Sequence, residues 1–194
     1  MIQYLHISAQ KQSNMEQSSD KVWYAMRATY GRNISAKHYA DSIGIITYIP
    51  MHYIVKRLGG GKVQRKYVPV IRDLIFVYAT KDEVKNLKRV IPYLQYITRP
   101  LNNRNIPIIV PEQEMRKFID VTLSENRDLI YLQPNELNIG KGTKVRVHGG
   151  ELDGYEGYFI KIKGKRNKRV VISFDSVIAV AIEVNPDFIE VIKS

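Results

Sequence analysis

Two alternating runs joined by a glycine-rich turn constrain the fold of this chain more than any other feature of its sequence. In residues 144–148 two valines alternate with basic residues, and in residues 158–163 a tyrosine and two isoleucines alternate with a phenylalanine and two lysines. A period of two indicates half-buried β-strands, and glycine tolerates the positive φ of a sharp turn. The glycines of the turn are Gly149, Gly150, Gly154 and Gly157. The stretch therefore predicts a strand, a turn and a second strand.

The same stretch resembles the KOW motif of transcription elongation and ribosomal proteins. The motif is V-x-V-x-x-G-x-x-x-G-x-x-G, and its fixed positions are matched by Val145, Val147, Gly150, Gly154 and Gly157. The alternative is an ordinary hairpin of an unrelated small barrel. Strand-like segments continue from residue 139 onward, at 143–148, 155–163, 169–174, 177–184 and 188–192. Together they predict a small, SH3-like five-stranded β-barrel (KOW), because closing a sheet removes its exposed edges.

The charge of the chain predicts an acidic partner. Its 194 residues have a formal net charge of +11, with 30 Lys and Arg against 19 Asp and Glu. Such a charge suits nucleic acid, an anionic membrane or an acidic protein surface. Clustering of the cations favours nucleic acid, and a solvated surface without a specific partner is the alternative. The two clusters are Lys56, Arg57, Lys62, Arg65 and Lys66, and Lys161, Lys163, Lys165, Arg166, Lys168 and Arg169.

Other classes of protein are disfavoured. No apolar run approaches the roughly 20 residues that cross a membrane, and residues 1–20 lack the apolar core of a signal peptide, so we expect a cytoplasmic protein with no membrane partner. The chain has no cysteine, and its four histidines lack the spacing of paired metal ligands. There is no pair of carboxylates, nucleophile–base motif or phosphate-binding glycine loop. We therefore expect no enzyme activity, no metal and no cofactor.

The first half of the chain, after a polar and flexible tail at 1–21, predicts an alternation of strands and helices. Apolar residues in 33–43 have the spacing of one helix face, and Thr80 with Glu83 predicts a capping box at the start of a second helix. Pro111 suits the first turn of a third helix. Strands are expected at 22–29, 45–58, 62–68, 70–79 and 93–98, with a hairpin tip at 59–61 and a linker at 124–138.

This order resembles the N-terminal domain of the NusG family. The segment W-Y-A-M-R at 23–27 is similar to the family's opening, and G-I-I-T-Y-I-P at 44–50 is similar to its "G-I-x-x-Y-x-P" strand. The run P-V-I-R-D-L-I-F-V at 69–77 is similar to "P-x-x-P-G-Y-x-F-V". The resemblance implies an α+β protein: a NusG-type N-terminal (NGN) domain at 22–123, with an antiparallel sheet and flanking helices, then the linker and a KOW domain at 139–194.

Departures from the family pattern indicate a subgroup. Residues 72–74 are R-D-L where the family commonly has Pro-Gly-Tyr, and residues 27–32 and 48–53 are similar to UpxY-type paralogues. Those proteins are antiterminators of particular long operons, such as polysaccharide clusters. The resemblance therefore implies a transcription elongation and antitermination factor that binds RNA polymerase and suppresses pausing or termination. An RNA- or ribosome-binding KOW protein that does not act on polymerase is the alternative.

The resemblance also implies partners and contact residues. Docking on the clamp helices of RNA polymerase is assigned to Trp23, Tyr24, Ile71, Leu74 and Phe76; alternatively, all five are core residues. Charge, rather than the resemblance, predicts contacts with nucleic acid in the transcription complex, and a solvated hairpin is the alternative. The residues are Arg27, Arg32, Lys37, Lys56, Arg57, Arg65 and Lys66. The KOW domain, a barrel already in the free protein, is expected to recruit a ribosomal protein or a termination factor. The chain itself is expected to be a monomer.

Overall fold

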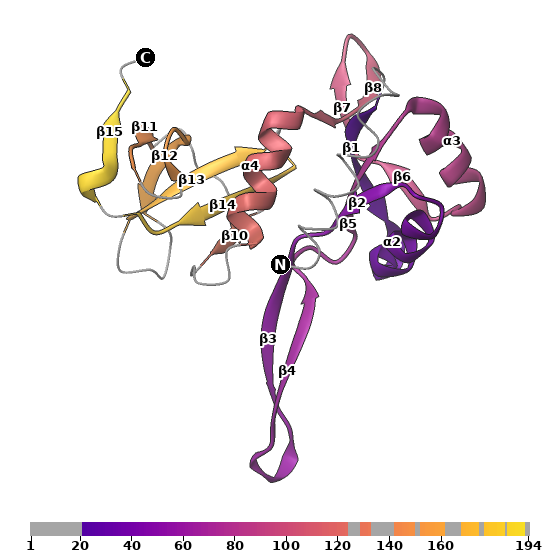
Figure 1. Cartoon of the computed structure of the whole chain (residues 1–194), viewed down its shortest axis with the longest axis horizontal. Helices are drawn as coiled ribbons and strands as arrows, with labels where there is room; N and C mark the ends of the chain where they lie inside the picture. The colour runs from indigo at the N-terminus through magenta and orange to yellow at the C-terminus, as the bar shows by residue number, and fades with distance from the viewer. Residues whose placement is uncertain are drawn as a thin grey trace. The chain divides into compact units, whose positions relative to one another are not determined.

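The computed structural model describes residues 21–123, 129–132, 142–149, 152–161, 168–174, 177–184 and 186–192 (Figure 1). The chain divides into two units, Met1–Ile119 and Asp120–Ser194. The first unit mixes helices with antiparallel strands, and the described part of the second consists mainly of antiparallel strands. The α+β class predicted from the sequence is therefore confirmed.

The first unit is built on an antiparallel sheet whose central strand is β1 (Val22–Ala28). The strand order is β2 (Ile46–Tyr48), β5 (Leu74–Ala79), β1 and β6 (Leu94–Tyr96), and β9 (Ile109–Val110) also pairs with β1. Strands β1 and β5 are apolar along almost their whole length, and most of their side chains are buried. Such continuous apolar runs are typical of strands that are covered on both faces.

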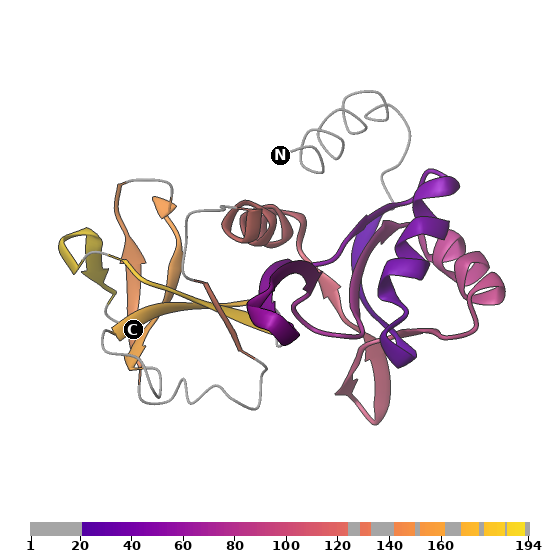
Figure 2. The same ribbon diagram turned by 90° about the horizontal axis from the view of Figure 1, so that it is seen from below.

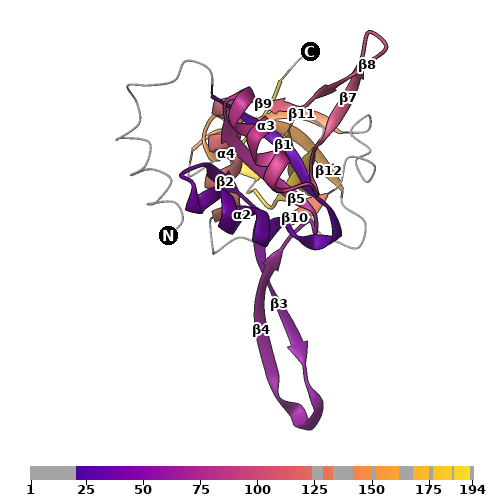
Figure 3. The same cartoon turned by 90° about the vertical axis from the view of Figure 1, so that its right-hand side faces the viewer.

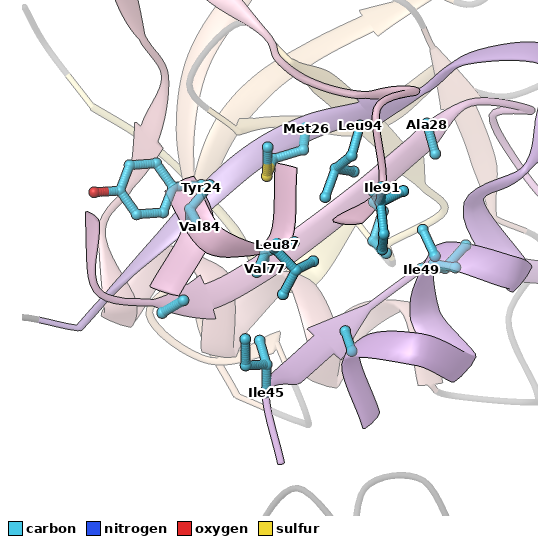
Figure 4. Packing of buried hydrophobic residues seen from close by; sticks show 14 residues of the cluster. Tyr24, Met26, Ala28, Ile45, Ile49, Val77, Val84, Leu87, Ile91 and Leu94 are labelled. Atoms are coloured by element: carbon cyan, nitrogen blue, oxygen red, sulfur yellow. The ribbon is translucent and has the colours of Figure 1, made fainter. Parts of the chain in front are cut away.

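Helices α2 (Asn33–Ser42) and α3 (Lys81–Val90) cover one face of this sheet (Figure 4). Their apolar residues pack on Tyr24, Met26 and Val77 in one buried cluster. The predicted capping box of α3 is confirmed. The Glu83 amide donates to the Thr80 hydroxyl over 3.1 Å, and the Thr80 amide donates to the Glu83 carboxylate over 2.7 Å.

The opposite face of the sheet packs against α4 (Glu112–Leu123). The ring of Phe118 lies edge to face with the rings of Phe76 and Tyr48, at centroid distances of 5.6 and 6.0 Å. Trp23 and Tyr78 extend this aromatic layer, with ring centroids 5.2 Å apart. The sheet is therefore the middle layer between helices.

Two ribbons of paired strands extend from this unit, β3 (Met51–Arg57) with β4 (Val63–Pro69), and β7 (Thr98–Leu101) with β8 (Arg104–Pro107) (Figures 1 and 3). The predicted glycine tip of the first ribbon is confirmed, with Gly60 and Gly61 at φ of 74° and 76°. One expectation was wrong: residues 45–58 form two strands rather than one. They separate at Pro50, which has no amide hydrogen and whose carbonyl accepts from the Val70 amide over 2.9 Å.

The second unit contains an antiparallel sheet in the order β10 (Ile130–Leu132), β14 (Ile178–Ile182), β13 (Lys168–Phe174), β12 (Glu156–Lys161), β11 (Thr143–Val147) and β15 (Ile189–Val191) (Figure 2). Strand β10 lies within the segment that the sequence predicts as a linker. Ile130 and Leu132 pack with the alanines of β14, whose small side chains leave room for them. The SH3-like closure of this sheet stays a prediction.

Candidate nucleic-acid interface

A pocket of about 670 Å³ lies where β1 ends and α2 begins. The residues around it are Arg27, Thr29, Tyr30, Arg32, Arg72, Asp73, Pro92, Tyr93 and Gln95. Arg27 stands opposite Leu74 of β5 and Gln95 of β6 in the sheet register, so its side chain is placed by paired strands on both sides. Arg27 is therefore held by the sheet, whereas Thr29, Tyr30, Arg72 and Asp73 reach the pocket from the turns beside it.

The backbone of the pocket is held in an unusual conformation at residues 29–31. Tyr30 has a φ of 64° and is 80% exposed; a left-handed conformation is uncommon for a bulky residue and typical of functional sites. The Gly31 amide donates to the Asp73 carboxylate over 2.7 Å, and the Thr29 amide donates to the Tyr93 carbonyl over 3.0 Å. These long-range bonds fix the turn and present the Tyr30 ring to solvent.

Arg32 connects the two tyrosines of the pocket. Its guanidinium carbon lies 3.7 Å from the ring centre of Tyr93 and 5.3 Å from that of Tyr30. Its Nε donates to the Thr29 carbonyl over 3.2 Å. Cation–π contacts of this kind contribute roughly 0.5–1 kcal/mol at exposed sites, and they hold the planar guanidinium in one orientation.

The charge of the pocket suits an anion. Among the described residues that line it are three arginines and one carboxylate, Asp73, which accepts a hydrogen bond from the Gly31 amide. Within the described part of the chain, Arg27, Arg32 and Arg72 form no ion pair. Arginine recognises phosphate, and aromatic faces recognise bases. The combination is chemically complementary to a group that is both planar and anionic.

The β3–β4 ribbon presents a second basic surface. Its cations are Lys56, Arg57, Lys62, Arg65 and Lys66, all of them exposed, and residues 51–70 contain no Asp or Glu. Tyr53 and Tyr67 face each other across the strands with ring centroids 4.8 Å apart. The guanidinium carbon of Arg65 lies 4.7 Å from the centre of the Tyr53 ring. The ribbon therefore carries one pair of aromatic rings near its base and five cations between that pair and its tip.

The described basic side chains of the second unit, in contrast, are paired with acids. Arg146 bonds to Glu156 at 2.6 Å, with Lys144 at 3.6 Å from the same carboxylate, and Arg169 bonds to Glu183 at 2.9 Å. The hydrogen bond from Arg146 lowers the pKa of the Glu156 carboxyl. The predicted cluster at 161–169 falls largely outside the residues whose side chains are described. The candidate interface is therefore placed on the first unit.

The structure brings together some of the basic residues predicted from the sequence and separates others. Arg27 and Arg32 share the pocket, and Lys56, Arg57, Arg65 and Lys66 lie on the ribbon. Lys37 belongs to neither group: its Nζ bonds to the carboxylate of Asp41 at 3.0 Å and lies within hydrogen-bond distance of Thr47. Sequence reasoning missed Tyr30, Arg72 and Tyr93. Tyr30 lies in the segment 27–32 and Arg72 in the segment 72–74, which depart from the family pattern, but neither departure indicated a shared pocket, and nothing local marked Tyr93.

The residues assigned to polymerase docking are mostly in the core. Trp23, Tyr24, Leu74 and Phe76 are buried, and Ile71 is half-buried. Burial raises the pKa of the Tyr24 hydroxyl. In this conformation four of the five present no surface to a partner, and only Ile71, in the turn before β5, reaches solvent.

The KOW-like residues have structural roles that their types explain. Val145 and Val147 are buried in β11, as the alternation predicts. Gly154 has a φ of 75°, which favours glycine. A Cβ on Gly157 would lie 2.5 Å from a backbone oxygen of β13, so only glycine fits between these strands. Gly150 lies outside the described residues.

Fold and charge together define a strongly basic protein of the α+β class. The sequence of residues 21–119 matches the family described as "Transcription termination factor nusG". The chain therefore belongs to the NusG family, whose members are transcription factors that bind RNA polymerase and are not enzymes. No curated protein matches the chain significantly. Among the residues that the structure describes, no helix is long and apolar enough to span a membrane.

Proposed function

We propose that this chain is a transcription elongation factor that associates with RNA polymerase through its first unit and suppresses pausing or termination. The family match over residues 21–119 supports this role. The UpxY-like segments at 27–32 and 48–53 support action on particular operons, such as polysaccharide clusters, rather than on all transcripts. Such an effect needs no chemistry, because preferential binding to the elongating state of polymerase is sufficient to shift its population.

The observation that carries the proposal furthest is the arginine–tyrosine pocket inside the family-matched domain. Arg27, Arg32 and Arg72 are supplied by three different segments yet surround one pocket. Phosphate contacts made by arginines release counterions, and each lost contact lowers the slope of log affinity against log salt by roughly 0.7–0.9. The pocket therefore fits nucleic acid that passes close to polymerase.

Substitution of pocket arginines tests this proposal. The double variant Arg27→Gln/Arg32→Gln should reduce terminator readthrough in a purified transcription system and lower the salt slope of nucleic-acid binding. The matched control is Lys85→Gln/Arg89→Gln, which removes the same charge from exposed positions of α3. If both double variants reduce readthrough equally, the effect is one of net charge and the pocket has no specific role.

Docking on the polymerase clamp helices is proposed for the surface around Ile71, with Trp23, Tyr24, Leu74 and Phe76 supporting it from the core. Ile71 lies in the turn at 70–73, whose backbone is tied to α2 because the Asn33 side chain donates to the carbonyls of Ile71 and Leu74. A polymerase pull-down with Ile71→Asp tests the contact. Undiminished binding would remove this surface from the docking site.

The second unit is proposed to be a KOW barrel that recruits a ribosomal protein or a termination factor. The glycine and valine positions of the motif support it, since Gly157 allows β12 and β13 to approach closely. A pull-down with ribosomal proteins and termination factors, using a chain that lacks residues 139–194 as the control, tests it. Retention of these partners by the shortened chain would contradict the assignment.

A further inference from the structure

The two faces of the β3–β4 ribbon differ in chemistry. In the strand register, Tyr53 stands opposite Tyr67, Val55 opposite Arg65, and Arg57 opposite Val63. Directly opposed residues project to the same side of a ribbon, so these side chains form one surface, here called the tyrosine face. The other side carries Lys56, Gln64 and Lys66 and is more polar.

The tyrosine face exposes far more apolar surface than an isolated ribbon requires. The exposed fractions are 57% for Tyr53, 49% for Tyr67, 61% for Val55 and 62% for Val63. Two paired strands alone are marginally stable in water. Contiguous exposed apolar residues next to charges are typical of a binding surface. The ribbon extends away from the sheet of its own unit, so these side chains are accessible over its length (Figures 1 and 3).

Charge decides what kind of partner this surface takes. Residues 51–70 hold five Lys and Arg and no Asp or Glu, namely Lys56, Arg57, Lys62, Arg65 and Lys66. A partner that covers the ribbon must be rich in negative charge, which nucleic acid supplies in every phosphate. A phosphate backbone alone, however, would leave the tyrosine rings and valines without an apolar partner.

The tyrosine pair favours single-stranded nucleic acid over a duplex. Its rings are 4.8 Å apart and tilted by 38°, with Arg65 4.7 Å from the centre of the Tyr53 ring. Bases of a single strand expose their faces and stack on aromatic side chains, whereas duplex bases are already stacked on their neighbours. We propose that the tyrosine face is a stacking platform for unpaired bases, with Arg57 and Arg65 contacting the adjoining phosphates. This rests on the proposed function, which brings the ribbon to nucleic acid.

Oligonucleotide binding by the full-length protein tests the platform. The probe is a fluorescein-labelled single strand of about 12 nucleotides, as DNA and as RNA, compared with a duplex of the same sequence. Tyr53→Leu and Tyr67→Leu should each weaken single-strand binding by at least about fivefold, the low end of the effect of losing one stacked base. The salt slope should stay unchanged, because no cation is removed.

Conservative and matched variants separate stacking from folding. Tyr53→Phe and Tyr67→Phe keep an aromatic face and should bind within about twofold of the unchanged protein. Tyr39→Leu, at an exposed position of α2, should have no effect. Lys56→Gln should lower the salt slope instead. Amide chemical shifts of the ribbon identify any variant in which the strands no longer pair. If a leucine variant fails in this way, the single-strand affinities of the phenylalanine variants and the unchanged protein are compared instead.

Two results would overturn the platform. One is unchanged affinity of both leucine variants for single strands. The other is duplex binding that is as tight as single-strand binding and equally sensitive to the leucine variants. Co-purification with polymerase distinguishes failure of the platform from failure of the proposed function. If the protein binds polymerase but does not prefer single strands over duplex, only the platform is rejected. Leucine-sensitive single-strand binding without any polymerase binding supports the platform and rejects the proposed function.

Discussion

The ring of Phe118 in α4 meets the ring of Phe76 in β5 edge to face, with centroids 5.6 Å apart. Both side chains are completely buried. Truncating a buried phenylalanine leaves a cavity, so Phe118→Ala should lower the free energy of unfolding by about 3–5 kcal/mol. Urea unfolding checks this, with the exposed Gln113→Ala as the control on the same helix. Equal stability of the two variants would mean that α4 is not part of this core.

Two aspartate substitutions separate core from surface in the segment assigned to polymerase docking. Leu74 is 3% exposed, so Leu74→Asp buries an unpaired carboxylate and should cost more than about 3 kcal/mol. Ile71→Asp, at a half-buried turn position, should leave a cooperative thermal transition. Circular dichroism on both variants checks this. A folded Leu74→Asp protein would show that the side chain can reach solvent.

Local signals predicted several elements because those elements depend on neighbours in sequence. The Thr80–Glu83 capping box and the Gly59–Gly61 tip are set within a few residues, and the alternation of β11 follows from its own pattern. The turn at 70–73 was instead predicted as strand. It is fixed by Asn33 and by the amide of Gly31, about 40 residues away, and no local pattern reveals such bonds.

The candidate site could be predicted only in part for the same reason. Arg27 and Arg32 were selected for their charge, but nothing local indicated that Tyr93 and Arg72 would join them. The pattern of apolar residues could not distinguish a core residue from a residue that contacts polymerase either. An apolar residue such as Phe76 suits either role, and it is buried because α4, more than 35 residues later in sequence, packs on its face of the sheet.

Relief of backbone strain at Tyr30 should stabilise the protein. A left-handed conformation costs a non-glycine residue about 1–2 kcal/mol, and part of this is offset by the unfolded-state entropy of glycine. Tyr30→Gly should therefore raise the free energy of unfolding by about 0.5–1 kcal/mol while weakening nucleic-acid binding. Chemical denaturation and oligonucleotide titration measure the two effects. A less stable variant would show that the exposed ring contributes packing that outweighs the strain.

The Gly31 position should be more sensitive than other glycines of positive φ. A Cβ there would lie 2.8 Å from Nε of Arg72, whereas a Cβ on Gly44, with a similar φ, meets nothing within 4 Å. Gly44→Ala should cost about 1 kcal/mol from strain alone, and Gly31→Ala should cost more and displace Arg72 from the pocket. Unfolding curves and nucleic-acid affinity of both variants check this. A Gly44→Ala cost that matches or exceeds that of Gly31→Ala would contradict the packing argument.

The stability of the first unit should respond to pH through Glu83. Burial opposes its ionisation, but the hydrogen bond from the Thr80 amide and the contact with Lys21 outweigh this, so the pKa of Glu83 is lowered. Its contribution to stability is therefore full above the ordinary glutamate pKa of 4.5 and is lost as the pH falls through the lowered value. Thermal unfolding of Glu83→Gln should show a smaller loss of stability on acidification than the unchanged protein. Identical loss of stability on acidification in the two proteins would show that Glu83 does not contribute to the pH dependence.

The second unit should need β10 for full stability. Ile130 and Leu132 pack with Val171, Ala179 and Ala181. A fragment of residues 129–194 should therefore unfold at a higher urea concentration than one of residues 139–194, because the shorter fragment exposes this apolar surface. Equal midpoints would show that β10 adds nothing and that the predicted boundary at 139 delimits the stable unit.

The most direct test of the account is single-round transcription with purified RNA polymerase across a terminator, with and without this protein. We predict that the protein co-migrates with the elongation complex and increases readthrough, and that Arg27→Gln/Arg32→Gln loses most of the increase while Lys85→Gln/Arg89→Gln retains it. Absence of co-migration and of any change in readthrough would contradict its assignment as an elongation factor that acts on polymerase.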